Sequence, residues 1–271
     1  MKSSNKLRPF IAASCVFLAA VGWADTESLR AVTEADHRSV ENRARNVFRH
    51  PVETLEFFGI RDDMTVVEIS PGGGWYTEIL APFLRDKGRL YAANYDQKSS
   101  EEYYRTNAKR FLEKLTAKPE IYDRVIPTVF DPPAKLEAAP PGIADLVVTF
   151  RNVHNWMEES SEVEAISAMY RALKPNGILG VVQHRQQPSI KQDPKAESGY
   201  LREDYLIALV EAAGFRFLAK SEINANAKDT GDHPEGVWTL PPTYELGDED
   251  HDKYQAIGES DRMTLTFIKQ E

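Results

Sequence analysis

The sequence predicts a doubly wound α/β fold, with a mostly parallel seven-stranded sheet, an antiparallel edge pair and helices on both faces. Three observations support this prediction. Short apolar segments alternate with amphipathic segments, at the spacing of crossover connections. A glycine cluster follows the first apolar segment, where such folds turn from a strand into a helix. The last two apolar segments have no helical segment between them, so we expect them to pair antiparallel.

The individual elements follow from hydrophobic period and from Gly and Pro punctuation. The expected strands are residues 65–70, 89–95, 125–130, 144–150, 178–184, 215–223 and 262–269. The expected helices between them are residues 75–88, 99–115, 162–173 and 202–214. Residues 131–142 are expected as a Pro-rich loop and residues 174–177 as a turn. Upstream, residues 26–48 are polar and free of Gly and Pro, and a second helix is expected from Pro51 to Gly59.

The N-terminus has the composition of an export signal. Residues 1–8 carry basic but no acidic side chains, and residues 9–23 are uncharged and mostly apolar. Gly22 and Ala24 supply the small side chains that signal peptidase accepts, so the sequence predicts a signal peptide cut after Ala24. An uncleaved membrane anchor is the alternative, although the apolar run falls short of the roughly 20 residues that a spanning helix needs. We therefore expect an exported protein, periplasmic or secreted, without stable membrane insertion after cleavage.

We expect three parts in the chain. They are a signal peptide over residues 1–24, a helical segment over residues 25–60, and an α/β domain over residues 61–271 with an insertion at 224–261.

Composition limits the chemistry of the mature chain. Cys15, the single cysteine, lies inside the predicted signal, so the mature chain has no disulfide, no reactive thiolate and no cysteine-ligated metal. Removal of the signal leaves 30 of the 33 basic residues against 42 acidic ones, a net charge of −12. Such an acidic chain is not expected to bind nucleic acid, and a small-molecule substrate is expected instead. The sequence leaves the oligomeric state open.

Ligands of doubly wound sheets bind beyond the carboxyl ends of the strands. The residues expected there are 70–74, 94–96, Asp131, 151–156 and 184–187. The insertion leaves from the same side, and its aromatic residues can form a roof over the site; a solvated decoration is the alternative. Those aromatic residues are Trp238, Tyr244 and Tyr254.

The glycine loop lies in the stretch "VVEISPGGGWYTEIL". Gly72, Gly73 and Gly74 allow the backbone to approach a ligand closely, and the following helix directs its first amides at the same place. A dinucleotide fingerprint requires a third glycine, and Thr77 stands at that position. A nicotinamide enzyme is therefore disfavoured.

The ordered set of motifs resembles the class I S-adenosylmethionine-dependent methyltransferases. "EISPGGG" resembles the first motif of that family, "ADLVVTFRNVHNW" its fourth strand and loop, and "RALKPNGILGVV" the helix, turn and strand before its antiparallel edge pair. The resemblance covers roughly residues 51–269. It implies a Rossmann-like methyltransferase fold and S-adenosyl-L-methionine as cofactor.

The resemblance also implies a set of cofactor-binding residues. They are Glu68, Ser70, Gly72, Gly73, Gly74, Asn94, Asp96 and Asp131. Glu68 and the glycines correspond to the methionine and ribose end, Asn94 with Asp96 to the ribose hydroxyls, and Asp131 to the adenine amino group. The sequence departs from the family pattern in three places. Asn94 stands where an acid is usual, Ser70 replaces the first glycine, and Pro71 removes an amide donor. For Asp131, a helix cap is the alternative role.

Methyl transfer from a sulfonium requires alignment of donor and nucleophile and, for some acceptors, a proton acceptor. His154 and His184 lie near the ends of the fourth and fifth strands and are candidate bases, with hydrogen-bonded packing as the alternative. Arg151 and Arg185 are candidates to bind an anionic substrate group, with structural ion pairs as the alternative. We expect these four residues to form the catalytic side of the site.

Other chemistry is less well supported by the sequence. Residues 229–235 and 247–252 mix carboxylates with His, but neither has the spacing of a calcium loop, so no metal site is expected. The sequence therefore predicts an exported methyltransferase that acts on a small molecule. The alternative is a non-catalytic ligand-binding protein on a methyltransferase scaffold, in keeping with Asn94, Ser70 and the export signal.

Overall fold

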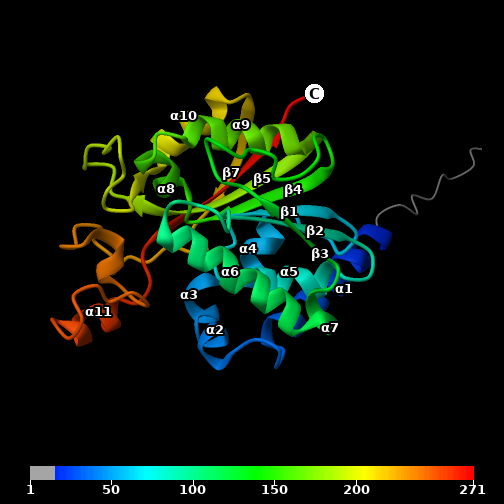
Figure 1. Cartoon of the computed structure of the whole chain (residues 1–271), viewed down its shortest axis with the longest axis horizontal. Helices are drawn as coiled ribbons and strands as arrows, with labels where there is room; N and C mark the ends of the chain where they lie inside the picture. The colour runs from blue at the N-terminus through cyan, green and yellow to red at the C-terminus, as the bar shows by residue number, and fades with distance from the viewer. Residues whose placement is uncertain (1–15) are drawn as a thin grey trace, which may run out of the picture.

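The predicted sheet is confirmed, with one small addition. The structure, a computed structural model, describes the backbone of residues 16–271 and the side chains from residue 25 onward. In this part of the chain the strands form one sheet in the order β3-β2-β1-β4-β5-β8-β7, and β6 pairs with β5 off this path (Figure 1). The strands are β1 (Thr65–Ile69), β2 (Arg89–Asn94), β3 (Val125–Val129), β4 (Ala144–Phe150), β5 (Leu173–Gln186), β6 (Leu201–Arg202), β7 (Phe215–Ser221) and β8 (Arg262–Lys269).

Helices cover both faces of the sheet, as expected for a doubly wound fold. The described helices are α1 (Val16–Glu34), α2 (Val40–Ala44), α3 (Asn46–Arg49), α4 (Pro51–Phe57), α5 (Thr77–Leu84), α6 (Glu102–Ala117), α7 (Pro119–Tyr122), α8 (Val153–Glu158), α9 (Glu162–Ala172), α10 (Glu203–Ala212), the 3₁₀ turn η1 (Gly236–Thr239) and α11 (His251–Ile257). Figure 1 shows α8, α9 and α10 on one side of the sheet and α4 to α7 on the other. Among the described helices, none combines the length and the apolar character needed to cross a membrane.

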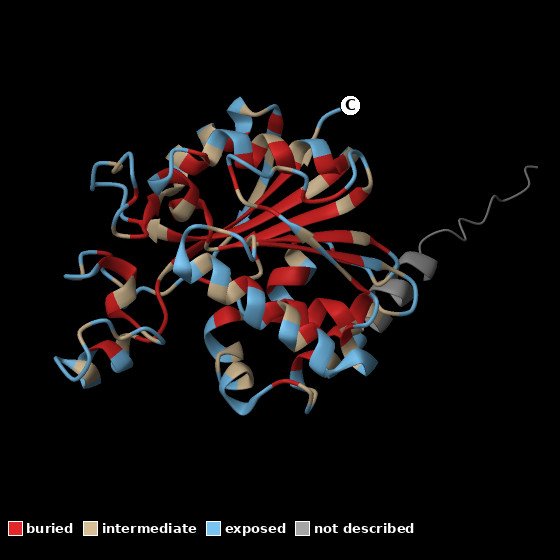
Figure 2. Cartoon of the chain, viewed as in Figure 1, coloured by how far each residue is buried: buried red, intermediate tan, exposed pale blue. Residues whose placement is uncertain are grey.

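Two hydrophobic cores lie against the two faces. Because side chains of a strand point alternately to opposite faces, Val66 joins the core under α4 and α5, whereas its neighbour Val67 joins the core under α9 and α10. Most positions in β1, β2, β4 and β8 are buried on both faces (Figure 2). This explains why these strands have near-continuous apolar sequences rather than alternating ones.

The antiparallel pair fixes the place of the insertion. β5 and β7 each pair antiparallel with β8, so β7 runs in the direction of the parallel strands. β7 therefore ends, and β8 begins, at the edge where the parallel strands end. The segment that joins them, residues 222–261, leaves and returns at this edge.

The N-terminal segment packs beside the glycine loop. The Trp75 ring lies 4.7 Å from the guanidinium carbons of both Arg38 and Arg49, and its Nε1 donates to Asn42 O (3.1 Å). The carboxylate of Glu78 accepts from the Asn42 amide at 3.0 Å. These contacts hold α2 and α3 against the start of α5.

The predicted signal peptide lies largely outside the described residues. Residues 1–15 are not described, and only the backbone is described for residues 16–24. The predicted cleavage point after Ala24 falls within α1.

Two local expectations were wrong. Residues 174–177, expected as a turn, belong to β5, where the pairing with β4 shifts register between Ala144 and Leu146 and Asn176 has φ 62°. The loop expected after β4 contains the short helix α8. That helix places His154 on its first turn, beside the end of β5.

Candidate functional site

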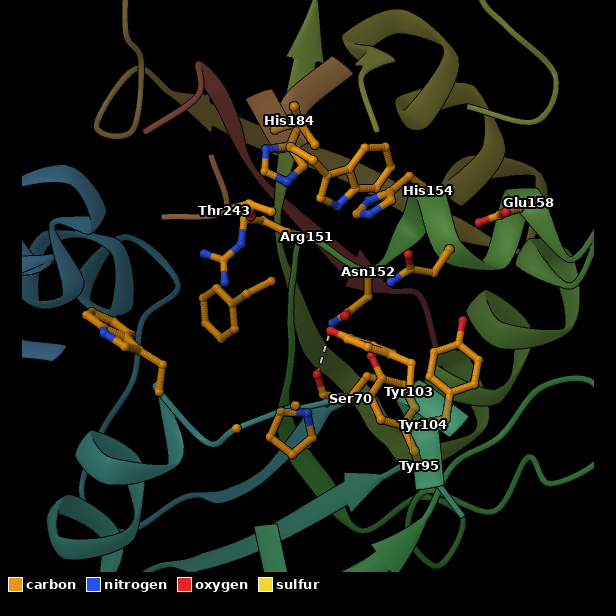
Figure 3. A pocket seen from close by; sticks show the side chains of 18 of the residues that line it. Ser70, Tyr95, Tyr103, Tyr104, Arg151, Asn152, His154, Glu158, His184 and Thr243 are labelled. Atoms are coloured by element: carbon orange, nitrogen blue, oxygen red, sulfur yellow. Dashed lines mark hydrogen bonds between the residues drawn. The ribbon is translucent and has the colours of Figure 1, made fainter. Parts of the chain in front are cut away.

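A cavity of about 1090 Å³ opens at the carboxyl edge of the parallel strands. Its walls come from the loop after β1, the ends of β2 to β5, the N-terminal helices and the insertion (Figure 3). Small-molecule sites commonly measure about 300–1,000 Å³. The cavity thus lies at the upper end of the sizes usual for small-molecule sites.

The glycine loop forms the floor of this cavity. A Cβ added to Gly72 or Gly73 would meet no atom within 4 Å, so both glycines present bare backbone to the open space. A Cβ on Gly74 would instead lie 3.0 Å from Phe111 of α6, which makes Gly74 a packing position outside the cavity. The loop therefore offers two of its three glycines to a ligand.

Ser70, the first residue of this loop, has a strained backbone and a hydroxyl without a hydrogen-bond partner among the described residues. Its φ is 48°, a conformation that non-glycine residues rarely adopt. It is 6% exposed, lines the cavity, and its Oγ has no hydrogen-bond partner among the described residues. A buried hydroxyl without a partner is costly, so a ligand group that bonds to it would be stabilised.

Asn94, at the end of β2, holds the glycine loop in place. Its Nδ2 donates to Gly72 O (3.1 Å), and its Oδ1 accepts from Gly72 N (3.3 Å). Lys114 of α6 donates from Nζ to Gly73 O (2.7 Å). Asn94 is 4% exposed and does not line the cavity, so its amide is committed to the loop.

Asn152 connects the end of β4 with the same loop. Its Nδ2 donates to Ile69 O (3.1 Å), to Ser70 O (3.3 Å) and to Thr149 Oγ1 (3.0 Å). Figure 3 shows the bond between Asn152 and Ser70. Asn152 therefore fixes the distance between the glycine loop and the residues that follow β4.

The two candidate histidines lie together, with their ring centroids 5.5 Å apart. His154 Nδ1 lies 3.1 Å from Gln183 Nε2. The orientation of that amide is set by Val153 N, which donates to its Oε1, and by Gly199 O, which accepts from its Nε2. Gln183 therefore donates to His154 Nδ1, and the neutral ring carries its proton on Nε2.

Both rings are held in the neutral state. Burial lowers the pKa of His154 to about 4. Burial also lowers the pKa of His184 well below its usual value, and nearby His154 and Arg151 lower it further. His184 Nδ1 lies 2.6 Å from Ser260 Oγ. At neutral pH these rings are hydrogen-bonding groups of low basicity.

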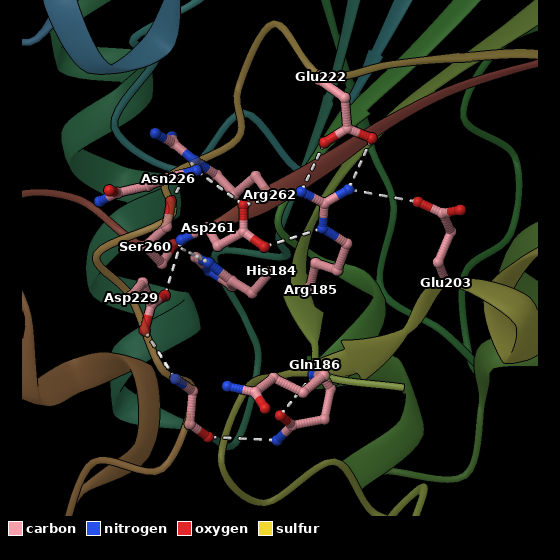
Figure 4. Close-up of polar contacts among 12 residues, drawn as sticks. His184, Arg185, Gln186, Glu203, Glu222, Asn226, Asp229, Ser260, Asp261 and Arg262 are labelled. Atoms are coloured by element: carbon pink, nitrogen blue, oxygen red, sulfur yellow. Dashed lines mark hydrogen bonds and ion pairs between the residues drawn. The ribbon is translucent and has the colours of Figure 1, made fainter. Parts of the chain in front are cut away.

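The two candidate arginines are in different situations. Arg151 lines the cavity with φ 63°, and burial lowers its pKa to about 10. Arg185 does not line the cavity. Its guanidinium pairs with Asp261 (2.8 Å), Glu222 (2.7 Å) and Glu203 (3.5 Å), as Figure 4 shows. This geometry is that of the structural ion pair considered as the alternative for Arg185.

Sequence reasoning missed part of the cavity wall. Arg45 and Arg49 from the N-terminal segment line it, as do Glu259 and Ser260, which precede β8. The sequence did contain a signal for Glu259 and Ser260. Because β8 is antiparallel, residues just before it must lie where the parallel strands end.

The insertion contributes directly to the cavity. Trp238 lines it, and its ring lies 5.7 Å from that of His154. Tyr244 and Tyr254, the other two aromatic residues expected in a roof, do not line it. Asp229 braces the insertion, since its carboxylate accepts from Tyr200 Oη (2.9 Å) and lies 2.8 Å from His233 Nε2. Within the described residues, no group of three or more potential ligands is placed to hold a metal.

Known proteins with a similar structure were found, although none with a similar sequence. No protein-family model and no curated protein sequence matches the chain. A SAM-dependent methyltransferase from Aquifex aeolicus superposes with a TM-score of 0.55 at 16% identity, over 90% of this chain and 97% of its own. The [4+2]-cyclase SpnF superposes with 0.56 at 18% identity, over 93% and 95%. A putative sarcosine dimethylglycine methyltransferase from Galdieria sulphuraria gives 0.55 at 12%, over 86% and 88%.

The fold is that of the class I S-adenosylmethionine-dependent methyltransferases. At these identities the comparisons establish the fold, as the sequence resemblance predicted. SpnF, a cyclase by its name, shows that the methyltransferase fold also occurs in a protein named for other chemistry.

The residues expected at the methyltransferase cofactor site divide into two groups. Ser70, Gly72, Gly73 and Asp131 line the cavity. The residues that do not line it are Glu68, Gly74, Asn94 and Asp96. Half of the residues that the resemblance implies for cofactor binding thus line the cavity.

Three acids of that set have distinct surroundings. Glu68 is 1% exposed and accepts from Thr77 Oγ1 (2.6 Å), and burial raises its pKa to about 7. Asp96 is paired with Lys135, which lowers its pKa. The pKa of Asp131 is raised by burial and then by Asp96. A turn closed by backbone bonds between Asp131 and Lys135 follows Asp131, rather than the helix that a cap would require.

Proposed function

We propose that this protein transfers a methyl group from S-adenosylmethionine to a small-molecule acceptor. The observation that carries the proposal is a single cavity with two unlike walls. One wall has the bare backbone of Gly72 and Gly73 and the unpartnered Ser70 Oγ; the other has Arg151 and His154. The first suits an adenosyl donor in this fold, and the second suits a polar acceptor.

The cavity wall fits the donor by its chemistry. Ser70 Oγ can donate to the methionine end, and the glycine backbone leaves room for a chain to pass closely. Asp131 can accept from the adenine amino group. When bound, S-adenosylmethionine supplies an electrophilic methyl group on a sulfonium. The residues of the chain supply the alignment, because Asn152 couples the glycine loop to the end of β4.

We further propose that His154 orients the acceptor rather than removing its proton. Its Nδ1 lone pair accepts from Gln183, so Nε2–H remains to donate a hydrogen bond. With a pKa of about 4, the ring is a weak base at neutral pH. The acceptor atom is therefore expected to be nucleophilic without help from His154. The Trp238 ring packs edge-on against this histidine on the cavity wall.

The test is a transfer assay with the purified full chain. The protein is incubated with S-adenosylmethionine and pools of small molecules, and release of S-adenosylhomocysteine is followed by mass spectrometry. We expect acceptor-dependent release that is lost in Ser70→Ala, which removes the hydroxyl and adds no bulk at this position of positive φ. Binding of the donor without release from any pool would support the alternative described next.

The alternative is a ligand-binding protein on this scaffold, and one observation favours it. The Asn94 amide, at the position where the family usually has a ribose-binding acid, is bonded in both directions to Gly72. Polar residues after β2 that line the cavity, among them Ser99 and Glu101, are candidates to replace that acid. A Glu101→Gln variant tests this replacement, since loss of donor affinity would indicate that a ribose site has been rebuilt, whereas turnover in the transfer assay distinguishes the enzyme from the binding protein.

We also propose that the chain is exported, on the evidence of residues 1–24 alone. Expression of the full chain in a bacterial host, fractionation and intact-mass measurement test this. The expected species is periplasmic and begins at Asp25. An uncut chain in the membrane fraction would support the anchor alternative.

A further inference from the structure

One wall of the cavity holds more positive charge than its described neighbours balance. Arg45, Arg49 and Arg262 all contact the carboxylate of Glu259, at 2.6, 3.1 and 3.1 Å. Arg151 lies in the same electrostatic group, because its charge and those of the other arginines all act on Glu259. Four guanidinium groups therefore share one buried carboxylate.

Two of these guanidinium groups have unused donors. No hydrogen bond or ion pair joins the Arg151 side chain to any described residue, although Arg151 lines the cavity. Arg49 is 3% exposed and also lines the cavity, and its Nη1 is buried without a partner. Arg151 is half-buried and unpaired, and the buried Arg49 pairs with Glu259 only through Nε, so the free donors of both are suited to a ligand that brings the missing negative charge.

The opposite wall has the reverse character. Glu158 and Glu159 line it together with three tyrosines, and burial and then the charge of Glu159 raise the pKa of Tyr104. Figure 3 shows Arg151, His184 and Thr243 on one side of the cavity, with Tyr103, Tyr104 and Glu158 on the other. The cavity is therefore polarised, and an anionic group is favoured only at the arginine wall.

We propose that Arg151, with the free Nη1 of Arg49, binds a carboxylate or phosphate group of the methyl acceptor. The assignment of the bound anion to the methyl acceptor rests on the proposed function, whereas the oxyanion site itself does not. Guanidinium groups match planar or tetrahedral oxyanions with paired hydrogen bonds. An anion held there lies on the wall that carries His184 and near His154, whose Nε2–H is available to a second polar atom.

A second molecule also carries such an oxyanion, namely the donor, through the carboxylate of its methionine part. The charge of Arg151 acts on Glu259 just before β8, whereas Arg49 packs against Trp75 beside the glycine loop. The position of Arg151 favours the acceptor. An anionic probe competes with S-adenosylhomocysteine only if the site holds the carboxylate of the donor, so one experiment separates the two cases.

The experiment measures anion binding by calorimetry at low ionic strength in a chloride-free buffer. The probes are benzoate and phenyl phosphate, with neutral benzamide as the matched control ligand. Each is titrated into the full chain alone and into the chain saturated with S-adenosylhomocysteine. The variants are Arg151→Gln and Arg89→Gln; Arg89 is an exposed arginine at the start of β2, outside the cavity.

We expect an anionic probe to bind at least about tenfold more tightly than benzamide, with or without S-adenosylhomocysteine. R151Q should lose about tenfold in probe affinity, keep its affinity for S-adenosylhomocysteine, and unfold at no lower urea concentration than the wild type. The last result follows because an unpaired cation is removed from a group of like charges. R89Q should bind every ligand as the wild type does.

Equal probe affinity in R151Q and wild type would overturn the inference. Mutual exclusion of probe and S-adenosylhomocysteine, with R151Q weakening both, would also overturn it and assign the arginines to the carboxylate of the donor. If S-adenosylhomocysteine fails to bind while the probe binds through Arg151, the oxyanion site stands and the proposed function fails.

Discussion

The side-chain amide of Asn94 and the backbone of Gly72 bond to each other in both directions, at 3.1 and 3.3 Å. Only an amide can do this, because a carboxylate has no proton to donate to Gly72 O. The departure from the acid usual in this fold thus has a physical reason in this chain. The residue that would contact a ribose instead fixes the loop.

Asn94→Asp should therefore destabilise the protein although it restores the usual residue type. The variant leaves Gly72 O without its donor and places a negative charge beside it. We expect a loss of about 1–3 kcal/mol in the free energy of unfolding, measured by urea denaturation. Asn107→Asp is the control, since the Asn107 amide donates to Tyr103 O on an exposed face of α6. Wild-type stability in N94D, with tighter donor binding, would show that Asn94 faces the ligand.

Glu68 should make stability depend on pH. Its pKa is raised from 4.5 to about 7, because burial disfavours the carboxylate. The folded state then holds a proton that the unfolded state has lost, so the free energy of unfolding falls as pH rises between these values. The effect is on the order of 3 kcal/mol at most. The difference between Glu68→Gln and wild type, measured by urea denaturation across this range, should grow in favour of the variant as pH rises. A constant difference would mean that Glu68 is ionised throughout.

His154 should not titrate near neutral pH. Its pKa is lowered from 6.5 to about 4 by burial, so its ring signals in an NMR titration should stay constant between about pH 5.5 and about pH 8. The signals are assigned by their absence in His154→Gln. The stability that the neutral ring contributes should be lost as pH falls from about 6.5 towards 4, because the unfolded state then binds the extra proton. A titration midpoint near about pH 6.5 for the His154 ring would contradict this prediction and support His154 as a general base.

Trp238 should matter for binding more than for folding. It is partly exposed on the insertion and covers His154, so Trp238→Ala should weaken binding of a cavity ligand roughly tenfold. Tyr244→Ala is the matched control, because Tyr244 stacks on His251 in the same insertion outside the cavity. Equal effects of the two variants on ligand affinity would indicate a general disturbance of the insertion rather than a roof at Trp238.

The sequence predicted the sheet and the site edge because both depend on local patterns. Buried parallel strands have apolar sequences, and topology places their ends together, so Ser70, Asp131, Arg151 and His154 could be assigned to one cavity before the structure. The hydrogen-bond and ion-pair partners of the site side chains could not be predicted from such patterns. Arg151 and Arg185 look alike in sequence, and only the three carboxylates around Arg185 distinguish them.

The arginine wall could not have been predicted from local patterns. Arg45 and Arg49 lie in a polar helical segment whose charges read as solvent-exposed, yet Arg49 is 3% exposed. Their partner Glu259 is more than 200 residues away, a separation at which hydrophobic period and turn signals carry no information. Contacts of this kind are determined by tertiary packing.

The glycine loop is proposed to face an adenosyl donor, and two glycines offer a matched test. Gly72 and Gly59 both have positive φ, 57° and 75°, and a Cβ on either would meet no atom within 4 Å, but only Gly72 lines the cavity. Alanine at either position should cost about 1–2 kcal/mol of backbone strain. Calorimetric titration of the full chain with S-adenosylmethionine should give binding near −8 kcal/mol, a micromolar Kd, which G59A retains and G72A weakens by about tenfold or more. Absence of heat from the folded wild type at about millimolar donor, or equal affinity in all three proteins, would show that the glycine loop does not face the donor.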